Sequence, residues 1–138
     1  MIDMTLDMAE KALKAAQAKA KDIGANMSVT VVDESGRMVF SARGDGCGFF
    51  TTDTSKGKAT VSAAFRRSTA EMSAGGVTPF LSSLPGLLPG QALPSGGAVP
   101  IFKDGYCIGA IGCGGGTAEQ DDECATAGAN TIGSATRS

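Results

Sequence analysis

The sequence predicts an α+β fold in which helices pack on one antiparallel sheet. Apolar stretches flank Asp104-Gly105, and a second pair flanks the turn at 33–36, which is the pattern of two β-hairpins. Helical periodicity dominates 6–23, and a capping box beginning at Thr117 opens a helix near the end of the chain. Two hairpins with helices between them favour an antiparallel sheet in the order α-β-β-α-α-β-β-α.

The first helix is expected over 6–23. Thr5 precedes it as the N-cap, and Gly24 follows it as a left-handed stop. Its apolar positions recur at steps of three and four residues: Leu6, Ala9, Leu13, Ala16, Ala20 and Ile23. Because most of these residues are alanine, the helix can lie close to its neighbour, which we expect to be a face of the sheet.

The first hairpin is expected to pair strands 27–32 and 37–43. Both are rich in β-branched or alternating apolar residues, and the segment between them has the composition of a turn. A glycine-containing loop follows. Asp53 is then expected to cap a helix over 54–67, and a short helix is expected from Thr69 to Ser73.

The segment 77–97 is expected to be a long loop, because it holds most of the prolines. Its leucines are too many for a flexible linker. Three roles remain open for it: a flap over a pocket, an arm that packs on a second subunit, or a cover for the sheet edge.

The second hairpin is expected over 98–113, followed by a glycine run and a helix over 118–132. Gly115 and Gly116 leave backbone N–H groups beside the helix N-terminus that Thr117 caps. A small anion can bind at such a place, so these three residues are candidate ligand-binding residues.

Bulk composition limits the class of protein. A chain of 138 residues predicts a single domain, 1–138. A net charge of −2 argues against a nucleic-acid partner, and no apolar run is long enough to span a membrane. Acidic residues near the start and no apolar signal core there favour a cytoplasmic protein.

The sequence contains no histidine, which removes the commonest general base and metal ligand. The four cysteines have neither zinc-site nor disulfide spacing, so no metal site is predicted and the thiols are expected to be reduced.

Several motifs together resemble one family. They are the lysine-alanine helix from Lys58 to Phe65, the Gly-Gly-x-x-Pro motif at 96–100, the run 108–112, and the Gly-Gly-Thr-Ala-Glu-Gln-Asp motif at 115–121. In these motifs the chain resembles the GlcG/HbpS-like family, which includes haem-binding HbpS and the C-terminal domain of PduO-type adenosyltransferases. The resemblance covers nearly the whole chain.

This resemblance implies a profilin-like fold around a five-stranded antiparallel sheet, assembled as a homo-oligomer. It also implies haem or a corrinoid as a ligand. Members that bind haem through histidine are not models for this chain, so a haem iron here would need a cysteine, Tyr106, a methionine or a threonine.

We expect one pocket to gather Arg43, Asp45, Lys58, Thr117 and Asp121. Two cations, two carboxylates and a helix N-terminus suit a small carboxylic acid. Lys58 is also a candidate base or Schiff-base amine, with Asp121 as its catalytic partner.

Three functions are therefore open. The first is a small-molecule binding protein, for a tetrapyrrole or a small carboxylic acid. The second is a cofactor-independent isomerase, lyase or hydratase that uses Lys58 and Asp121. The third is a structural subunit of a homo-oligomer, in which the predicted pocket would be filled by the protein's own side chains.

Overall fold

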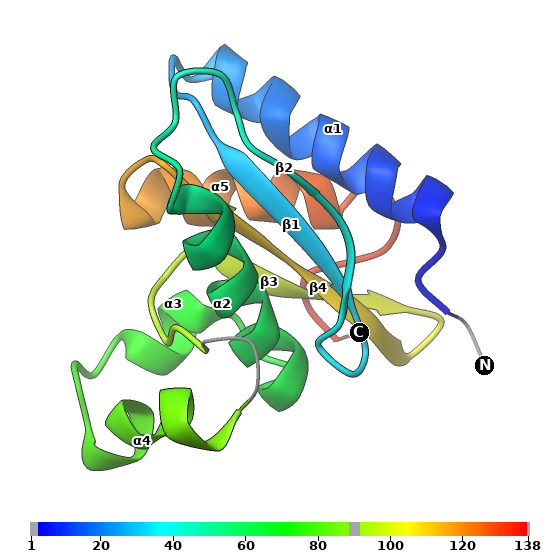
Figure 1. The fold of residues 1–138 in the computed structure, drawn as a ribbon. Coiled ribbons are helices and arrows are strands. Elements are labelled where there is room, and N and C mark those ends of the chain that lie inside the picture. Colours follow the sequence, from blue (N-terminus) through cyan, green and yellow to red (C-terminus); the bar gives the residue numbers. More distant parts are fainter. Residues whose placement is uncertain (1–2, 89–91, 138) are drawn as a thin grey trace.

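The computed structural model describes residues 3–88 and 92–137 and contains one antiparallel sheet with strand order β2-β1-β4-β3. Helices cover both faces of this sheet (Figure 1). The elements in order are α1 (Leu6–Asp22), β1 (Ser28–Asp33), β2 (Met38–Ala42), α2 (Thr51–Phe65), α3 (Thr69–Ser73), α4 (Pro79–Leu87), β3 (Ala98–Lys103), β4 (Tyr106–Gly114) and α5 (Ala118–Ala129).

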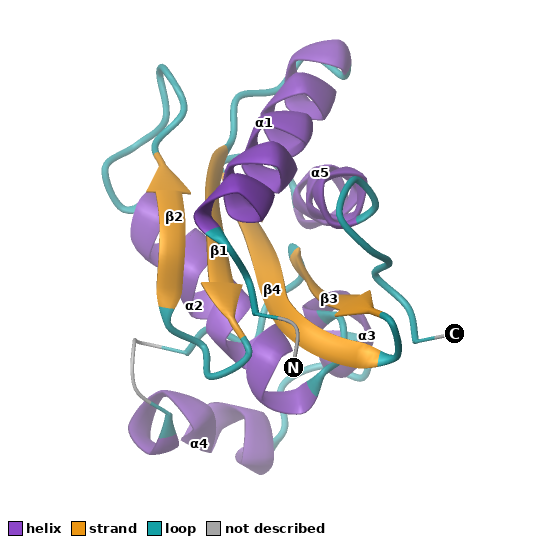
Figure 2. Cartoon of the chain, turned by 90° about the vertical axis from the view of Figure 1, so that its right-hand side faces the viewer, coloured by secondary structure: helices purple, strands orange, loops and turns teal. Residues whose placement is uncertain are grey.

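The helices form two layers with the sheet between them. Helices α1 and α5 lie on one face of the sheet and α2 on the other (Figure 2). The main core fills the space under α1 and α5, where the apolar side chains of β1, β3 and β4 are buried. The prediction of an α+β fold with helices packed on an antiparallel sheet is confirmed.

The predicted fifth strand is wrong for the described residues, which form four strands. Other groups occupy the free edge of β3, where a further strand would pair. The Thr69 hydroxyl accepts a hydrogen bond from Ala98 N at 3.0 Å, and Ser134 exchanges backbone hydrogen bonds with Phe102 at 2.8 and 2.9 Å.

The predicted element order is also wrong, because the segment 77–97 contains helix α4. Thr78 caps this helix through its side chain, and Pro79 stands in its first turn, where a missing N–H costs nothing. Leu81 and Leu84 are buried against Val61 of α2, not against the sheet edge. Residues 89–91 of this segment lie outside the described residues.

Helix α2 packs very close to the sheet because glycine and small hydroxyl residues face each other there. A Cβ at Gly112 of β4 would lie 2.2 Å from the carbonyl oxygen of Ser55. The Thr30 hydroxyl of β1 lies 2.8 Å from the Ser55 hydroxyl, and the Ser28 hydroxyl of β1 lies 2.7 Å from the Thr51 hydroxyl. This contact fixes the height of α2 above β4, and therefore where its side chains reach.

Helix α1 packs on the sheet as expected, but it packs equally against α5. A Cβ at Gly128 of α5 would lie 2.6 Å from the carbonyl oxygen of Ala12 and 3.3 Å from the Ala16 methyl. The alanine stripe of α1 therefore serves a helix–helix contact that its periodicity alone does not reveal.

The structure corrects one predicted cap. Helix α2 begins at Thr51, so Asp53 lies in its first turn and is not its N-cap. Its N-cap is Phe50, which makes no side-chain capping bond.

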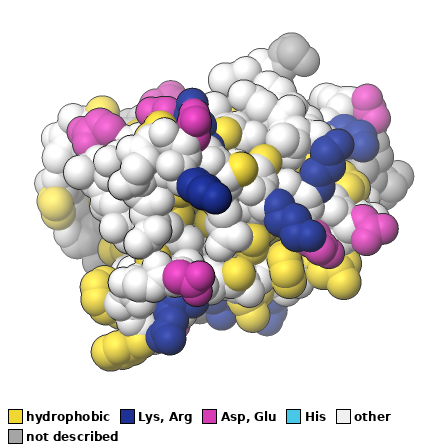
Figure 3. Space-filling model, turned by 90° about the horizontal axis from the view of Figure 1, so that it is seen from above, with side chains coloured by type: hydrophobic (Ala, Val, Ile, Leu, Met, Phe, Trp, Pro, Cys, Tyr) yellow, Lys and Arg dark blue, Asp and Glu magenta, His cyan; other side chains and the backbone are white. Residues whose placement is uncertain are grey.

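Charged side chains of both signs are interspersed on the face seen in Figure 3, which shows no patch of a single sign. No helix in the described part of the chain is long and apolar enough to cross a lipid bilayer.

Candidate functional site

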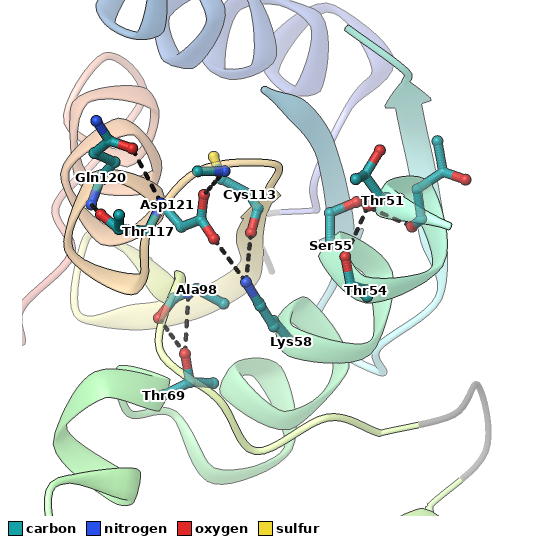
Figure 4. Close-up of polar contacts among 12 residues, drawn as sticks. Thr51, Thr54, Ser55, Lys58, Thr69, Ala98, Cys113, Thr117, Gln120 and Asp121 are labelled. Carbon is teal, nitrogen blue, oxygen red and sulfur yellow. Dashed lines mark hydrogen bonds and ion pairs between the residues drawn. The ribbon is translucent and has the colours of Figure 1, made fainter. Parts of the chain in front are cut away.

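Lys58 and Asp121 form a buried ion pair at the end of β4. Lys58 comes from α2 and Asp121 from the first turn of α5, so the pair joins the two helical layers around the end of the sheet (Figure 4). Lys58 Nζ lies 2.9 Å from Asp121 Oδ2 and 3.0 Å from the carbonyl oxygen of Cys113. The two side chains are only 8% and 4% exposed. An ammonium group has three N–H donors, and these two bonds leave Lys58 one donor for another partner.

The glycine run is expected to bind an outside anion, but the structure places the carboxylate of Asp121 there. Gly116 N donates to Asp121 Oδ1 at 3.0 Å. Thr117 N donates to the Gln120 side chain at 3.0 Å, and Gln120 N donates to the Thr117 hydroxyl at 3.1 Å, so the predicted capping box is confirmed. The bonds from Gly116 N and Lys58 Nζ, one to each oxygen, hold the Asp121 carboxylate in place.

Gly97 makes room for the ion pair. Its φ of +132° is in the region that favours glycine, and a Cβ there would lie 2.8 Å from Asp121 Cβ and 2.9 Å from Lys58 Nζ. From the sequence, Gly97 is expected only as part of a motif and not as a site residue. The doubled glycine before a strand was the available signal.

A pocket of about 560 Å³ opens beside the ion pair. The ion pair forms part of its wall, together with backbone of the glycine run and small polar groups. The lining residues are Asn26, Gly46, Cys47, Gly48, Phe50, Thr51, Thr54, Lys58, Leu93, Ser95, Gly115, Gly116 and Asp121. Below we call this the Lys58 pocket.

The structure brings together four of the seven candidate ligand-binding residues in this wall: Lys58, Gly115, Gly116 and Asp121. Arg43 and Asp45 do not join them, because both are exposed on the loop after β2 and neither lines the pocket. Thr117 is exposed as well, and its hydroxyl is used for the helix cap.

The loop that carries Arg43 and Asp45 does contribute to the pocket, through other residues. Cys47 and Phe50 line it, and so do Leu93 and Ser95 from the end of the segment 77–97. None of these four residues was predicted as a site residue from the sequence. Only the flap interpretation of that segment placed any of its residues near a ligand, and it named none.

The four cysteines differ in how far they can take part in chemistry. Burial raises the pKa of the Cys113 thiol well above its usual value, and burial also raises the pKa of Cys124 to about 11. Cys47 is half-buried and faces the Lys58 pocket. No group of three or more Cys, Asp or Glu side chains within 3–88 and 92–137 is placed to hold a metal ion.

Residues 4–130 match the family model described as haem degrading protein HbpS-like. The chain belongs to the HbpS-like family. It is also 36% identical, over 86% of its length and 84% of the relative's, to a 15.0 kDa protein encoded in the dhaT–dhaS intergenic region of Citrobacter freundii.

Solved structures of this family share the fold. Klebsiella pneumoniae ORFY superimposes with a TM-score of 0.83 at 26% identity, over 96% of this chain and 92% of that one. A double mutant of Streptomyces reticuli HbpS gives 0.82 at 32% identity, over 96% and 89% of the two chains. A PduOC–haem complex gives 0.82 at 24% identity, over 95% and 96%, which shows the fold alone.

Proposed function

We propose that this member of the HbpS-like family is a small-molecule binding protein whose ligand occupies the Lys58 pocket. The observation that carries the proposal is the ion pair in the pocket wall. Burying two charges costs free energy that their attraction barely offsets, so stability alone is a weak reason for this pair to stand in a pocket wall. Here one ammonium N–H has no partner among the described residues, and it stands beside an open pocket.

A small carboxylic acid is the ligand class that suits these groups best. Its carboxylate would accept the remaining N–H of Lys58, while Asn26 and Ser95 supply further polar side chains in the wall. Phe50 and Leu93 give the pocket an apolar part for the ligand's carbon atoms. Because Lys58 is already bound to a carboxylate and a carbonyl, we favour a charged anchor over an amine nucleophile.

A tetrapyrrole is the second candidate, supported by the haem bound to the PduOC neighbour and by the thiol in this pocket. Cys47 is the one side chain in the described pocket wall with a sulfur donor, and Lys58 would meet a propionate. When bound, a haem would supply a redox-active iron; the chain itself would supply the thiolate and the polar wall.

The other two functions are weaker candidates. A cofactor-independent enzyme would use the same Lys58 and Asp121, and it requires turnover that Asp121→Asn abolishes. A purely structural subunit would have the pocket filled by its own side chains, whereas this pocket has a volume of about 560 Å³. Assembly into a homo-oligomer and a cytoplasmic location remain predictions.

Native mass spectrometry of the purified protein tests the proposal, because it reports any retained ligand together with the number of subunits. Calorimetric titration with glycolate and lactate follows, and so does an absorbance titration with haemin that records its Soret band, each on the wild type and on Ser95→Ala and Cys47→Ser. Loss of acid binding in Ser95→Ala identifies the acid site. Loss of the Soret shift in Cys47→Ser alone identifies a thiolate-bound haem. A protein that retains nothing and binds none of the three probes would contradict the proposal.

A further inference from the structure

A second pocket, of about 510 Å³, lies at the free edge of β3, away from the Lys58 pocket. Neighbouring groups pair with this edge at its two ends, through Thr69 at Ala98 and through Ser134 at Phe102. Between them stands Pro100, which faces the same edge, because alternate residues of a strand point their backbone groups to the same side. Proline has no N–H to offer, so this gap is unsuited to an added strand and suited to a ligand that contacts side chains.

Arginines surround the gap. Arg66 and Arg67 directly follow α2, and Arg137 comes from the segment after α5. Arg67 is paired with Glu71 at 2.9 Å, whereas Arg66 and Arg137 form no ion pair with any residue in the described ranges. The Arg137 guanidinium lies 5.0 Å from the centre of the Phe102 ring, a cation–π contact that holds it beside the pocket.

A carboxyl group and an apolar surface complete the wall. Asp122 of α5 lines the pocket, and its Oδ1 is buried with no hydrogen-bond partner among the described residues. A buried acceptor without a donor destabilises the folded protein, so a ligand that donates a hydrogen bond to Asp122 would bind favourably here. Phe65 and Val99 also line the pocket and offer carbon surface in the same wall.

We propose that this edge pocket binds a small organic acid that carries a hydroxyl or amino group. The acid group of the ligand pairs with Arg66 and Arg137, which can each donate several N–H bonds to a carboxylate. The carbon skeleton covers Phe65 and Val99. The hydroxyl or amino group donates to Asp122. This site is separate from the Lys58 pocket and does not depend on its proposed function.

Amide-resolved NMR of the full chain tests the proposal with four probes of similar shape. Hydroxyisocaproate and leucine carry both groups, isocaproate lacks the donor, and isoamyl alcohol lacks the acid. We expect hydroxyisocaproate, leucine or both to shift the amides of 65–71, 98–99, 101–102 and 122–126, and the alcohol to shift none. Comparison of the two identifies whether a hydroxyl or an ammonium group is preferred.

Charge and donor variants then separate the two contacts. Arg66→Gln with Arg137→Gln should weaken binding of the preferred probe by about tenfold or more. Lys11→Gln with Lys21→Gln, which removes the same charge from the exposed side of α1, should leave it unchanged. Asp122→Ala should abolish the preference over isocaproate. Shifts that cluster instead around Lys58, no shift with any probe at millimolar concentration, or full affinity in the double arginine variant would each overturn the proposal.

Discussion

Replacing Lys58 by methionine should destabilise the protein severely, because it leaves a buried carboxylate without its counter-ion. The Asp121 side chain is 4% exposed, and after the substitution the one donor it keeps among the described residues is the N–H of Gly116. The carbonyl of Cys113 also loses a donor. Breaking one side of a buried ion pair typically costs about 3–5 kcal/mol. For a chain of this size that lowers Tm by about 10 °C or more.

A double-mutant cycle shows whether the cost comes from the pair itself. Lys58→Met leaves the Asp121 carboxylate without its counter-ion, and Asp121→Asn removes that charge. The double variant should therefore lose about 2 kcal/mol less unfolding free energy than the sum of the two single losses. Urea unfolding followed by far-ultraviolet circular dichroism measures all four proteins. Lys56→Met is the matched control, since Lys56 lies on the same helix, half-buried and without an ion pair to a described residue, and should change stability by less than about 0.5 kcal/mol.

Two results would contradict a rigid ion pair. One is an unfolding free energy of Lys58→Met within about 1 kcal/mol of the wild-type value, and the other is additive losses of unfolding free energy for the two substitutions. Either result would mean that water or a rearranged side chain satisfies Asp121, and that the pair is not a rigid part of the pocket wall.

Three further predictions concern other parts of the molecule. Gly112→Ala should lower the unfolding free energy by about 1–3 kcal/mol in urea, because the new methyl would lie 2.2 Å from the Ser55 carbonyl oxygen and must displace it. An unchanged urea midpoint would show that α2 moves freely. Iodoacetamide at pH 8 should modify Cys47 in the native protein and spare Cys124, whose pKa of about 11 follows from burial, as peptide mass mapping will show. Partial burial acts to raise the pKa of Asp33, but hydrogen bonds from Ser35 and Arg37 within the turn outweigh burial, so the pKa is lowered. Asp33 therefore stabilises the fold fully above its unfolded pKa, and this stabilisation is lost as the pH falls through the folded pKa. Asp33→Asn should therefore flatten the loss of stability below about pH 4; an identical acid profile would exclude this role.

Local signals in the sequence were enough for most elements. Asp104 and Gly105 both adopt positive φ, 52° and 83°, as a two-residue hairpin turn requires, and Gly24 ends α1 with φ +75°. The Thr117 capping box starts α5 where expected. Each of these depends on hydrogen bonds between residues a few positions apart, so short-range sequence determines them. The Thr78-Pro79 signal for α4 was equally local, and the prolines of the segment concealed it.

The site depended on contacts that no local pattern contains. Lys58 and Asp121 stand 63 positions apart, and they meet only because Gly112 lets α2 approach β4 and Gly97 leaves space between the two side chains. Arg43 and Asp45 carry the same two opposite charges as the pair, yet both are exposed on their loop. The sequence determined which residues can carry charge and where the chain turns. The tertiary structure decided which charges are buried together, because burial depends on the packing of elements that are distant along the chain.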